Sequence, residues 1–312
     1  MKGSAPTDVI ARLGLAERLL VDGFLCPGYR IAPGMLRSLR PLLVRLIWAS
    51  APDIRRSLRR NARILLPPGN DEEDRRQFGL EVLCEIQQFT EELVRASSRD
   101  EIEDEADINS IGNIQQYFAR RERGGGIVIA TAHMGSFEVA ASVLVQMEKK
   151  VHVVYARDPS KSIERMRSKL RRDLGVIEHA VDDGIETWRA LQEALERDEA
   201  VALPADRVQP GQVGFDCELL GHKTRLPSGP FKLAMTTGSP LVPAFCWRNH
   251  DDEYRITVEA PIEFDGEYCR NLTEHPGVRN FVEAFETALR NNPTQWLMVF
   301  DAWPESLERT DS

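Results

Sequence analysis

A histidine and a glutamate five residues apart form the pattern in this chain with the clearest chemical potential. His133 and Glu138 lie in ATAHMGSFEVA, directly after the apolar stretch GIVIATA. Histidine has an unperturbed pKa near neutrality, and a carboxylate bonded to one ring nitrogen fixes the tautomer and stabilises the imidazolium. The pair therefore predicts a general base, His133, that removes a proton from a hydroxyl, with Glu138 as its orienting partner.

The spacing limits how this pair can meet. Five residues on one continuous helix place two side chains about 140° apart. We therefore expect His133 in a turn and a helix that begins near Gly135 or Ser136, with Ser136 as N-cap and Glu138 in the first turn. The alternative is a hydrogen-bonded histidine at a strand end and an acid favoured there by the helix dipole. Spacing alone leaves both interpretations open.

The elements around the motif alternate between apolar runs and helical periodicity. Residues 71–122 have helical spacing in EVLCEIQQFTEELVRA and NSIGNIQQYFARR. From Gly124 onward, short apolar runs (GIVIATA, VHVVYA, VIEHA, EAVALPADR, SPLVPAFCWR, YRITVEAPIEF) alternate with helical stretches. This order predicts an α/β fold, a mixed sheet covered by helices, with a helical N-terminal section.

The N-terminal section differs from the rest of the chain in charge. Residues 1–67 carry twelve Lys/Arg and four Asp/Glu, a charge of +8. Because the net charge of the chain is −9, residues 68–312 carry −17. Within it, MLRSLRPLLVRLIWASA has Leu and Trp interrupted by arginines, and is too short and charged to span a bilayer. We predict that 1–67 is a basic amphipathic helical segment that associates with an anionic membrane surface, and that 68–312 is the catalytic α/β domain. A helix packed on the core with solvated arginines is the alternative.

Cysteine usage and the N-terminus indicate the compartment. The five cysteines are scattered, without a CxxC pair, so neither a disulfide framework nor a zinc site is indicated. The sequence MKGSAPTDVIARLGLAERLL lacks the apolar core of a signal peptide. A reducing cytosol fits best, and we predict no metal ligand and no nucleic-acid partner.

Further candidate site residues follow other apolar runs. Arg157 comes after VHVVYA, and Asp206 and Arg207 come after VALPA. Ser228 and Gly229 could open a helix whose free backbone N–H groups face an anionic ligand. Charged residues at strand ends often belong to sites in α/β folds, although many are solvated loop charges.

Four segments together resemble the lysophospholipid acyltransferase superfamily. His133 and Glu138 match its HxxxxD/E motif, VVYARDPS is similar to the second conserved region, and VALPADR with GHKTRLPSGPFKLAMTTGSPLVPAF is similar to the third. NNPTQWLMVFDAWP resembles the closing NPxQW segment of one bacterial branch. That branch contains late lipid A (lauroyl/myristoyl) acyltransferases and phosphatidylinositol mannoside acyltransferases, and the similarity spans roughly residues 60–304.

The resemblance implies a glycerol-phosphate acyltransferase-like fold and a reaction. An acyl chain would move from an acyl carrier protein or coenzyme A thioester to a hydroxyl of a membrane lipid or glycolipid, without a metal or redox cofactor and without an acyl-enzyme. His133 is then the general base and Glu138 its partner. Arg157, Asp206, Arg207, Ser228 and Gly229 carry over as substrate-binding or framing residues. The implied location is the cytoplasmic face of the bacterial inner membrane, with peripheral or monotopic attachment.

Departures from the family pattern bear on the subfamily. Where lipid A enzymes commonly have an Asp-Gln-Asp-like element, this chain has PADR at 204–207, which is closer to the mannoside acyltransferases. The arginine-interrupted N-terminal segment also does not match the transmembrane helix that family members often carry.

Other function classes find less support in the residues. The chain has no GxSxG elbow, which a serine hydrolase of the α/β type would need. It also has no HxxxH or HxxE pairing with His133, which a zinc hydrolase would need. A non-catalytic lipid-binding module of the same fold is the remaining alternative, because a fold does not guarantee activity.

Overall fold

The computed structural model describes residues 21–97, 111–158, 160–209, 212–249, 251, 253–264, 269 and 271–304. Residues 1–20 of the predicted membrane-association segment and the acidic stretch EIEDEAD at 101–107 lie outside the described residues. The other expected elements can be compared with the structure directly.

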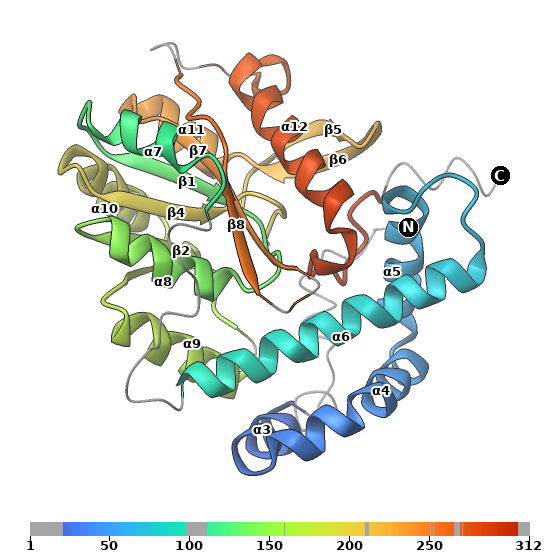
Figure 1. The fold of residues 1–312 in the computed structure, drawn as a ribbon. Coiled ribbons are helices and arrows are strands. Elements are labelled where there is room, and N and C mark those ends of the chain that lie inside the picture. The colour runs from blue at the N-terminus through green and yellow to red at the C-terminus, as the bar shows by residue number, and fades with distance from the viewer. Residues whose placement is uncertain are drawn as a thin grey trace.

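A six-stranded sheet in the order β3-β2-β4-β1-β7-β8 forms the centre of the molecule (Figure 1). Its strands are β1 Ile127–Thr131, β2 Val151–Tyr155, β3 Ile177–Ala180, β4 Ala200–Pro204, β7 Leu241–Arg248 and β8 Tyr254–Val258. All neighbouring pairs are parallel except β7 and β8, which are antiparallel. The central strands read as continuous apolar runs because helices cover both faces of a parallel sheet.

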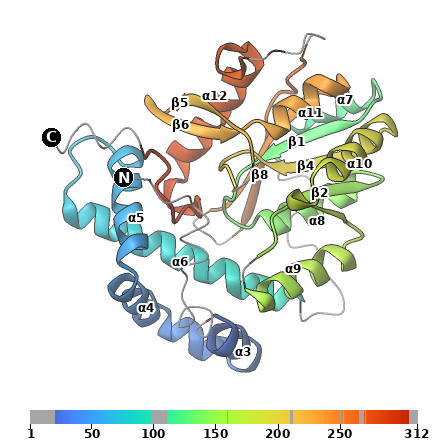
Figure 2. The same ribbon diagram turned by 180° about the vertical axis from the view of Figure 1, so that it is seen from behind.

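Helices on the two faces of the sheet differ in what they bury. One face packs against α10 Ile185–Glu196, α11 Gly229–Thr237 and α12 Pro276–Asn291, with Leu191, Phe231 and Phe281 fully buried (Figure 2). The other face meets α7 Ile114–Arg121 and α8 Phe137–Met147. Beside them, α9 Lys161–Asp173 packs against β3 and α6.

The sheet and its covering helices confirm the predicted fold class. All six apolar runs named from the sequence form strands, including the short β3. A separate hairpin of β5 Gly214–Leu219 and β6 His222–Pro227 was not predicted, because its strands alternate polar and apolar residues around Gly221 without a long apolar run. Short turns η3 Val181–Asp183, η4 Leu272–Glu274 and η5 Pro293–Gln295 complete this part of the chain.

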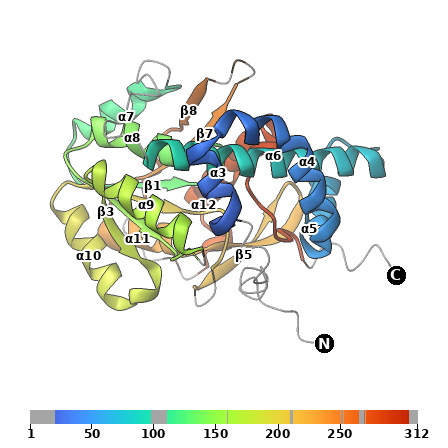
Figure 3. The ribbon, with the colours of Figure 1, turned by 90° about the horizontal axis from the view of Figure 1, so that it is seen from below.

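The N-terminal section is a layer of helices built on one long helix. It comprises η1 Val21–Leu25, α3 Cys26–Ile31, α4 Pro33–Ser50, α5 Pro52–Leu65 and α6 Glu72–Ser97, and α4 and α5 both pack along α6 (Figure 3). The stretch predicted to lie in a membrane interface thus has one face against the rest of the protein, and the boundary at residue 67 remains a prediction.

Helix α4 has two apolar stripes rather than one. Leu36, Val44 and Trp48 are buried, and a side chain at Gly79 of α6 would collide with the Trp48 indole. The Trp48 indole therefore lies on the core side of α4, in a groove over a glycine. Met35 and Leu42 are exposed instead. No helix among the described residues is long and apolar enough to cross a bilayer.

Candidate active site

His133 and Asp206 occupy equivalent positions at the carboxyl edge of the sheet. β1 and β4 are parallel neighbours whose last residues, Thr131 and Pro204, are register partners. His133 and Asp206 each follow two residues later, so two residues far apart in the sequence meet at the same edge. Parallel α/β sheets place ligand sites at this edge.

The carboxylate that holds His133 belongs to Asp206 and not to Glu138. The Nδ1 of His133 lies 2.9 Å from Oδ1 of Asp206, and the backbone N–H of His133 donates to Oδ2 at 3.1 Å. The indole Nε1 of Trp296 also donates to Oδ2, at 2.9 Å. The predicted orientation of His133 by Glu138 is therefore wrong, because Glu138 points its carboxylate at arginines on α9.

Burial and charge determine the protonation of this pair. Burial opposes the charge of Asp206, but His133, Arg207 and the Trp296 N–H together hold its pKa well below the usual range. Burial and the nearby Arg207 lower the pKa of His133, although Asp206 opposes this. At neutral pH the ionised Asp206 thus accepts from a proton on Nδ1 of a neutral imidazole. The lone pair is then on Nε2, and His133 lines a cavity.

Glu138 forms the centre of a buried charge cluster. Its Oε1 accepts hydrogen bonds from Nε of Arg167 at 2.8 Å and from Nη2 of Arg171 at 3.2 Å. Burial works against ionisation, but the two arginines outweigh it and lower the pKa of Glu138. The cluster ties the first turn of α8 to α9, beside the histidine loop. A catalytic role for Glu138 remains a prediction.

The loop that carries His133 is held by the segment at 293–297. Gly135 has φ of 51°, and a Cβ there would come within 2.6 Å of the carbonyl oxygen of Cys246, so only glycine fits. The backbone N–H of Gly135 donates to the carbonyl of Gln295, and that of Leu297 donates to the carbonyl of His133, both at 2.9 Å. Ser136 precedes α8 as expected, although its side chain makes no capping bond. The segment that contains NPTQW thus fixes the position of the His133 loop through backbone hydrogen bonds.

Two other predicted arginines line the same cavity in different environments. Burial lowers the pKa of Arg207, and its Nε has no hydrogen-bond partner among the described residues. Arg157 is half exposed at the cavity rim and pairs with Asp182 and, at 2.9 Å, with Asp183. Arg207 therefore brings a desolvated positive charge close to His133, whereas the charge of Arg157 is already matched.

Ser228 and Gly229 open α11, as the sequence predicted. The Ser228 hydroxyl donates to the carbonyl of Val213 at 2.8 Å, so this group fixes a loop. A Cβ at Gly229 would collide with the ring of Trp188, at 2.6 Å from its nearest atom. Both residues line the cavity, so the start of α11 contributes part of its wall.

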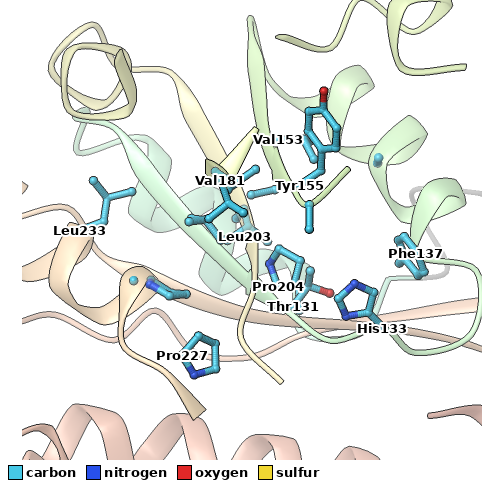
Figure 4. Close-up of a pocket in the computed structure, with 18 of the residues that line it drawn as sticks. Thr131, His133, Phe137, Val153, Tyr155, Val181, Leu203, Pro204, Pro227 and Leu233 are labelled. Carbon is cyan, nitrogen blue, oxygen red and sulfur yellow. The ribbon is translucent and has the colours of Figure 1, made fainter. Parts of the chain in front are cut away.

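The cavity has a volume of about 1100 Å³ and continues from His133 beneath α8. Figure 4 shows His133, Thr131 and Pro204 together at the strand ends, with Phe137 on the adjacent helix. Beneath α8 the cavity is almost wholly apolar, with walls from α8 and from the sheet: Ala140, Val143, Leu144, Met147, Ile129, Val153, Ala202, Val242, Ala244, Ile256 and Val258. Tyr117 also lines the cavity, and its hydroxyl donates to Glu148. We call this part the apolar slot.

Three contributors to the site were missed from the sequence. Arg167 and Arg171 sit four residues apart on α9, and their spacing places them on one helix face, but nothing in the chain indicates which acid they meet. Trp296 lies in the quoted NPTQW segment without a predicted role. No group of three or more His, Cys, Asp or Glu side chains among the described residues is arranged to hold a metal ion.

Comparison with known proteins adds independent information. The family model described as bacterial lipid A biosynthesis acyltransferase matches residues 35–304. A phosphatidylinositol mannoside acyltransferase of Mycobacterium tuberculosis is 31% identical over 138 residues, which are 44% of this chain and 43% of that protein. Its namesake from Mycolicibacterium smegmatis is 26% identical over 192 residues, 61% of each chain. The chain thus matches between about two fifths and three fifths of the length of these relatives.

Proposed function

The chain belongs to the bacterial lipid A biosynthesis acyltransferase family, and from this premise we propose that it transfers a fatty acyl chain from a thioester to a hydroxyl of a membrane lipid or glycolipid. The observation that carries the proposal is the His133–Asp206 pair at the mouth of an apolar slot. A base suited to activating an alcohol and a space suited to a hydrocarbon chain occur in one cavity. Acyl transfer by this pair requires neither the GxSxG turn of a serine hydrolase nor a zinc site.

The pair supports direct transfer by general-base catalysis. Nε2 of His133 takes the proton of the acceptor hydroxyl as its oxygen attacks the thioester carbonyl. Asp206 stabilises the imidazolium that forms, and the nearby Arg207 favours the negative charge that develops on the carbonyl oxygen. Collapse of the tetrahedral intermediate breaks the carbon–sulfur bond. The thiolate then receives the proton from His133, which returns to its neutral state.

The two parts of the cavity suit the two substrates. Burial of a hydrocarbon chain in the apolar slot is favoured by about 0.8 kcal/mol for each methylene removed from water. The mouth carries Arg157, Arg207 and the start of α11, which are polar groups suited to an acceptor. Both coenzyme A and acyl carrier protein present the acyl group on a thioester arm, so we propose either as donor. The names of the relatives favour a mannosylated glycolipid as acceptor class.

Surface residues support a location at a membrane. Ile31, Met35, Leu42 and Leu46 are exposed on α3 and α4, and their spacing places the last three on one side of α4. We propose that this side rests on the cytoplasmic leaflet of the bacterial inner membrane, as a peripheral or monotopic attachment.

The direct test is an acyl-transfer assay with purified protein. Radiolabelled acyl-CoA and acyl-ACP are each incubated with membrane lipid extract, and wild type is compared with His133→Ala. We expect labelled lipid with wild type and a loss of about 10³-fold in the variant. Equal transfer by both proteins would overturn the mechanism. Tight retention of lipid without any turnover by wild type would favour the lipid-binding module instead.

A further inference from the structure

One side chain joins the end of β7 to the loop that carries His133. The side-chain amide of Gln295 makes two hydrogen bonds to the backbone of Arg248, the last residue of β7. Its Oε1 accepts from the Arg248 N–H at 2.7 Å, and its Nε2 donates to the Arg248 carbonyl at 2.7 Å. The backbone carbonyl of Gln295 accepts from the N–H of Gly135, two residues after His133. Gln295 thus contacts both elements through different groups.

The amide binds β7 on the edge that faces away from β8. On that side, the pairing of β7 with β1 ends at Pro243. On the β8 side, Asn249 donates its backbone N–H to the carbonyl of Glu253. Hydrogen-bonded and non-hydrogen-bonded pairs alternate along antiparallel strands, so the backbone groups of the preceding residue, Arg248, point away from β8. The Gln295 amide occupies the position that a peptide unit of another strand would have there.

The end of β7 is itself held in place. Arg248 is 5% exposed, and its guanidinium is paired with Glu85 and Glu92 on α6, beside which the β7–β8 hairpin ends (Figure 1). Removal of one partner from a buried ion pair is strongly destabilising, so this contact keeps β7 in a fixed relation to α6. The backbone of Arg248 is therefore a rigid support for the amide that is bonded to it.

On its other side, Gln295 begins a short antiparallel pairing with the His133 loop. Trp296 is the bridge partner of Met134, and hydrogen bonds between the two segments flank this pair. The indole N–H of Trp296 also donates to Asp206 at 2.9 Å. A displacement of Gln295 would therefore move two things together: the loop that carries His133 and the indole that holds its carboxylate partner.

We propose that Gln295 is a positioning residue of the acyl-transfer site, which sets the orientation of His133 toward Asp206 from outside the cavity. Gln295 is not among the described residues that line the catalytic cavity, so it acts through the loop and not on a substrate. The kinetic consequence rests on the proposed acyl transfer. The orientation of His133 exists in the free protein, so it can be measured without any substrate.

The first test is spectroscopic and needs no turnover. Protein labelled with ¹⁵N at histidine is compared with Gln295→Met, which keeps the length of the side chain and removes both amide bonds. In wild type we expect a protected Nδ1 proton on His133, because that proton lies between the ring and Asp206; His133→Asn assigns its resonance. In Gln295→Met we expect this resonance to shift or to disappear through exchange with water. An unchanged resonance would overturn the proposal.

The second test is kinetic. Gln295→Met should lower kcat by about 10²-fold, because a base displaced by about 1 Å loses its alignment with the reacting hydroxyl. KM should stay within about two-fold, since no substrate contact is removed. Gln295→Glu keeps an acceptor for the Arg248 N–H and loses the donor, so its kcat relative to wild type should recover as the pH falls and the carboxyl gains a proton. A raised KM with unchanged kcat would overturn the positioning role.

A matched control separates positioning from stability. Asn61 on α5 is another amide bonded to the same C-terminal segment, through the Phe300 carbonyl at 2.7 Å and the Ala302 N–H at 3.0 Å, and it is 1% exposed. Asn61→Leu should lower the melting temperature at least as much as Gln295→Met, yet keep the His133 resonance and hold kcat within about two-fold. Equal losses of resonance and rate in both variants would overturn the proposal in favour of general loosening. Absence of transfer by wild type would count against the proposed function alone, because the resonances can still be compared.

Discussion

Two histidine–carboxylate pairs in this molecule have the same contact distance and different surroundings. His133 meets Asp206 at 2.9 Å, and His152 on β2 meets Glu199 at 2.9 Å. His152 uses both ring nitrogens, since its Nδ1 lies 2.8 Å from Nε2 of His179. His133 uses only Nδ1 for a described partner and lines a cavity. A histidine bonded to a carboxylate is therefore a catalytic candidate only where the second nitrogen can reach a substrate.

The carboxylates of the two pairs differ in the same way. Asp206 is buried and receives three hydrogen bonds, two from His133 and one from Trp296. Glu199 is buried too, but Arg197 and Lys150 reach it from the surface. Glu199 thus belongs to a structural charge cluster. Asp206 instead accepts hydrogen bonds from His133 and Trp296.

The largest effect expected from this comparison is a difference between the two histidines. His133→Asn should reduce acyl transfer by about 10³-fold, because a neutral amide cannot take the proton that Nε2 of His133 accepts. His152→Asn should leave the rate within about two-fold. The measurement is initial rate with matched enzyme concentrations, and circular dichroism serves as the folding control. A large loss in both variants would remove the distinction.

The second prediction compares the carboxylates. Asp206→Asn should lower kcat by about 10²-fold or more, because the amide no longer stabilises the imidazolium and can favour the wrong tautomer. Glu199→Gln should have little effect on kcat. Steady-state kinetics with a fixed donor gives both values. If Asp206→Asn raised only KM, Asp206 would be a substrate-binding group, as the sequence alone suggested.

The third prediction concerns Glu138, the carboxylate that the sequence placed beside His133. Glu138→Gln should destabilise the protein by about 3 kcal/mol, because Arg171 is buried and loses a charged partner. Urea unfolding measures this change. Activity should fall far less than in Asp206→Asn when assayed well below the unfolding transition. A loss of rate with unchanged stability would instead assign Glu138 a direct part in catalysis.

The smallest effect expected is a difference in pH dependence. The pKa of His133 is lowered by burial and by Arg207, so kcat/KM should rise with pH through a value below 6.5 and then level off.

Burial also lowers the pKa values of His152 and His179, so the folded state binds fewer protons than the unfolded chain. Stability from this pair is complete above the unfolded pKa near 6.5 and is lost as the pH falls below it.

The variant His152→Asn separates these two pH effects. It should flatten the slope of unfolding free energy between pH 7.5 and 5.5 and leave the pH profile of kcat/KM unchanged. A shift of the kinetic profile in this variant would show that the clusters are coupled.

Much of the architecture follows from local patterns. The apolar runs of β1, β2, β4 and β7 predicted a covered sheet because strands buried on both faces need apolar side chains throughout. Ser136 before α8 and Ser228 before α11 also indicated helix starts. The hairpin at 214–227 was not predicted because its signal is alternation over short strands that also suits a loop.

The partner of His133 could not be chosen from the sequence. The motif in the sequence suggests Glu138, five residues away, as that partner, whereas the partner in the structure, Asp206, lies 73 residues away. His133 and Asp206 lie close together because β1 and β4 are neighbouring parallel strands whose register pairs Thr131 with Pro204. Knowledge of the strand order would have been the useful signal, since both residues follow their strands by two positions. Trp296 joins them only because the 293–297 segment returns to the histidine loop.

The sequence by itself determined the family resemblance, the α/β alternation and the basic N-terminal section, and it predicted His133 as the base, because these depend on residue type and on short-range periodicity. Only the tertiary structure decided that Asp206 orients His133, that Glu138 pairs with Arg167 and Arg171, and that Trp48 faces the core. It also formed the apolar slot. Those features depend on contacts between side chains of elements that are distant in the sequence. Only the packing of these elements in the folded protein determines such contacts.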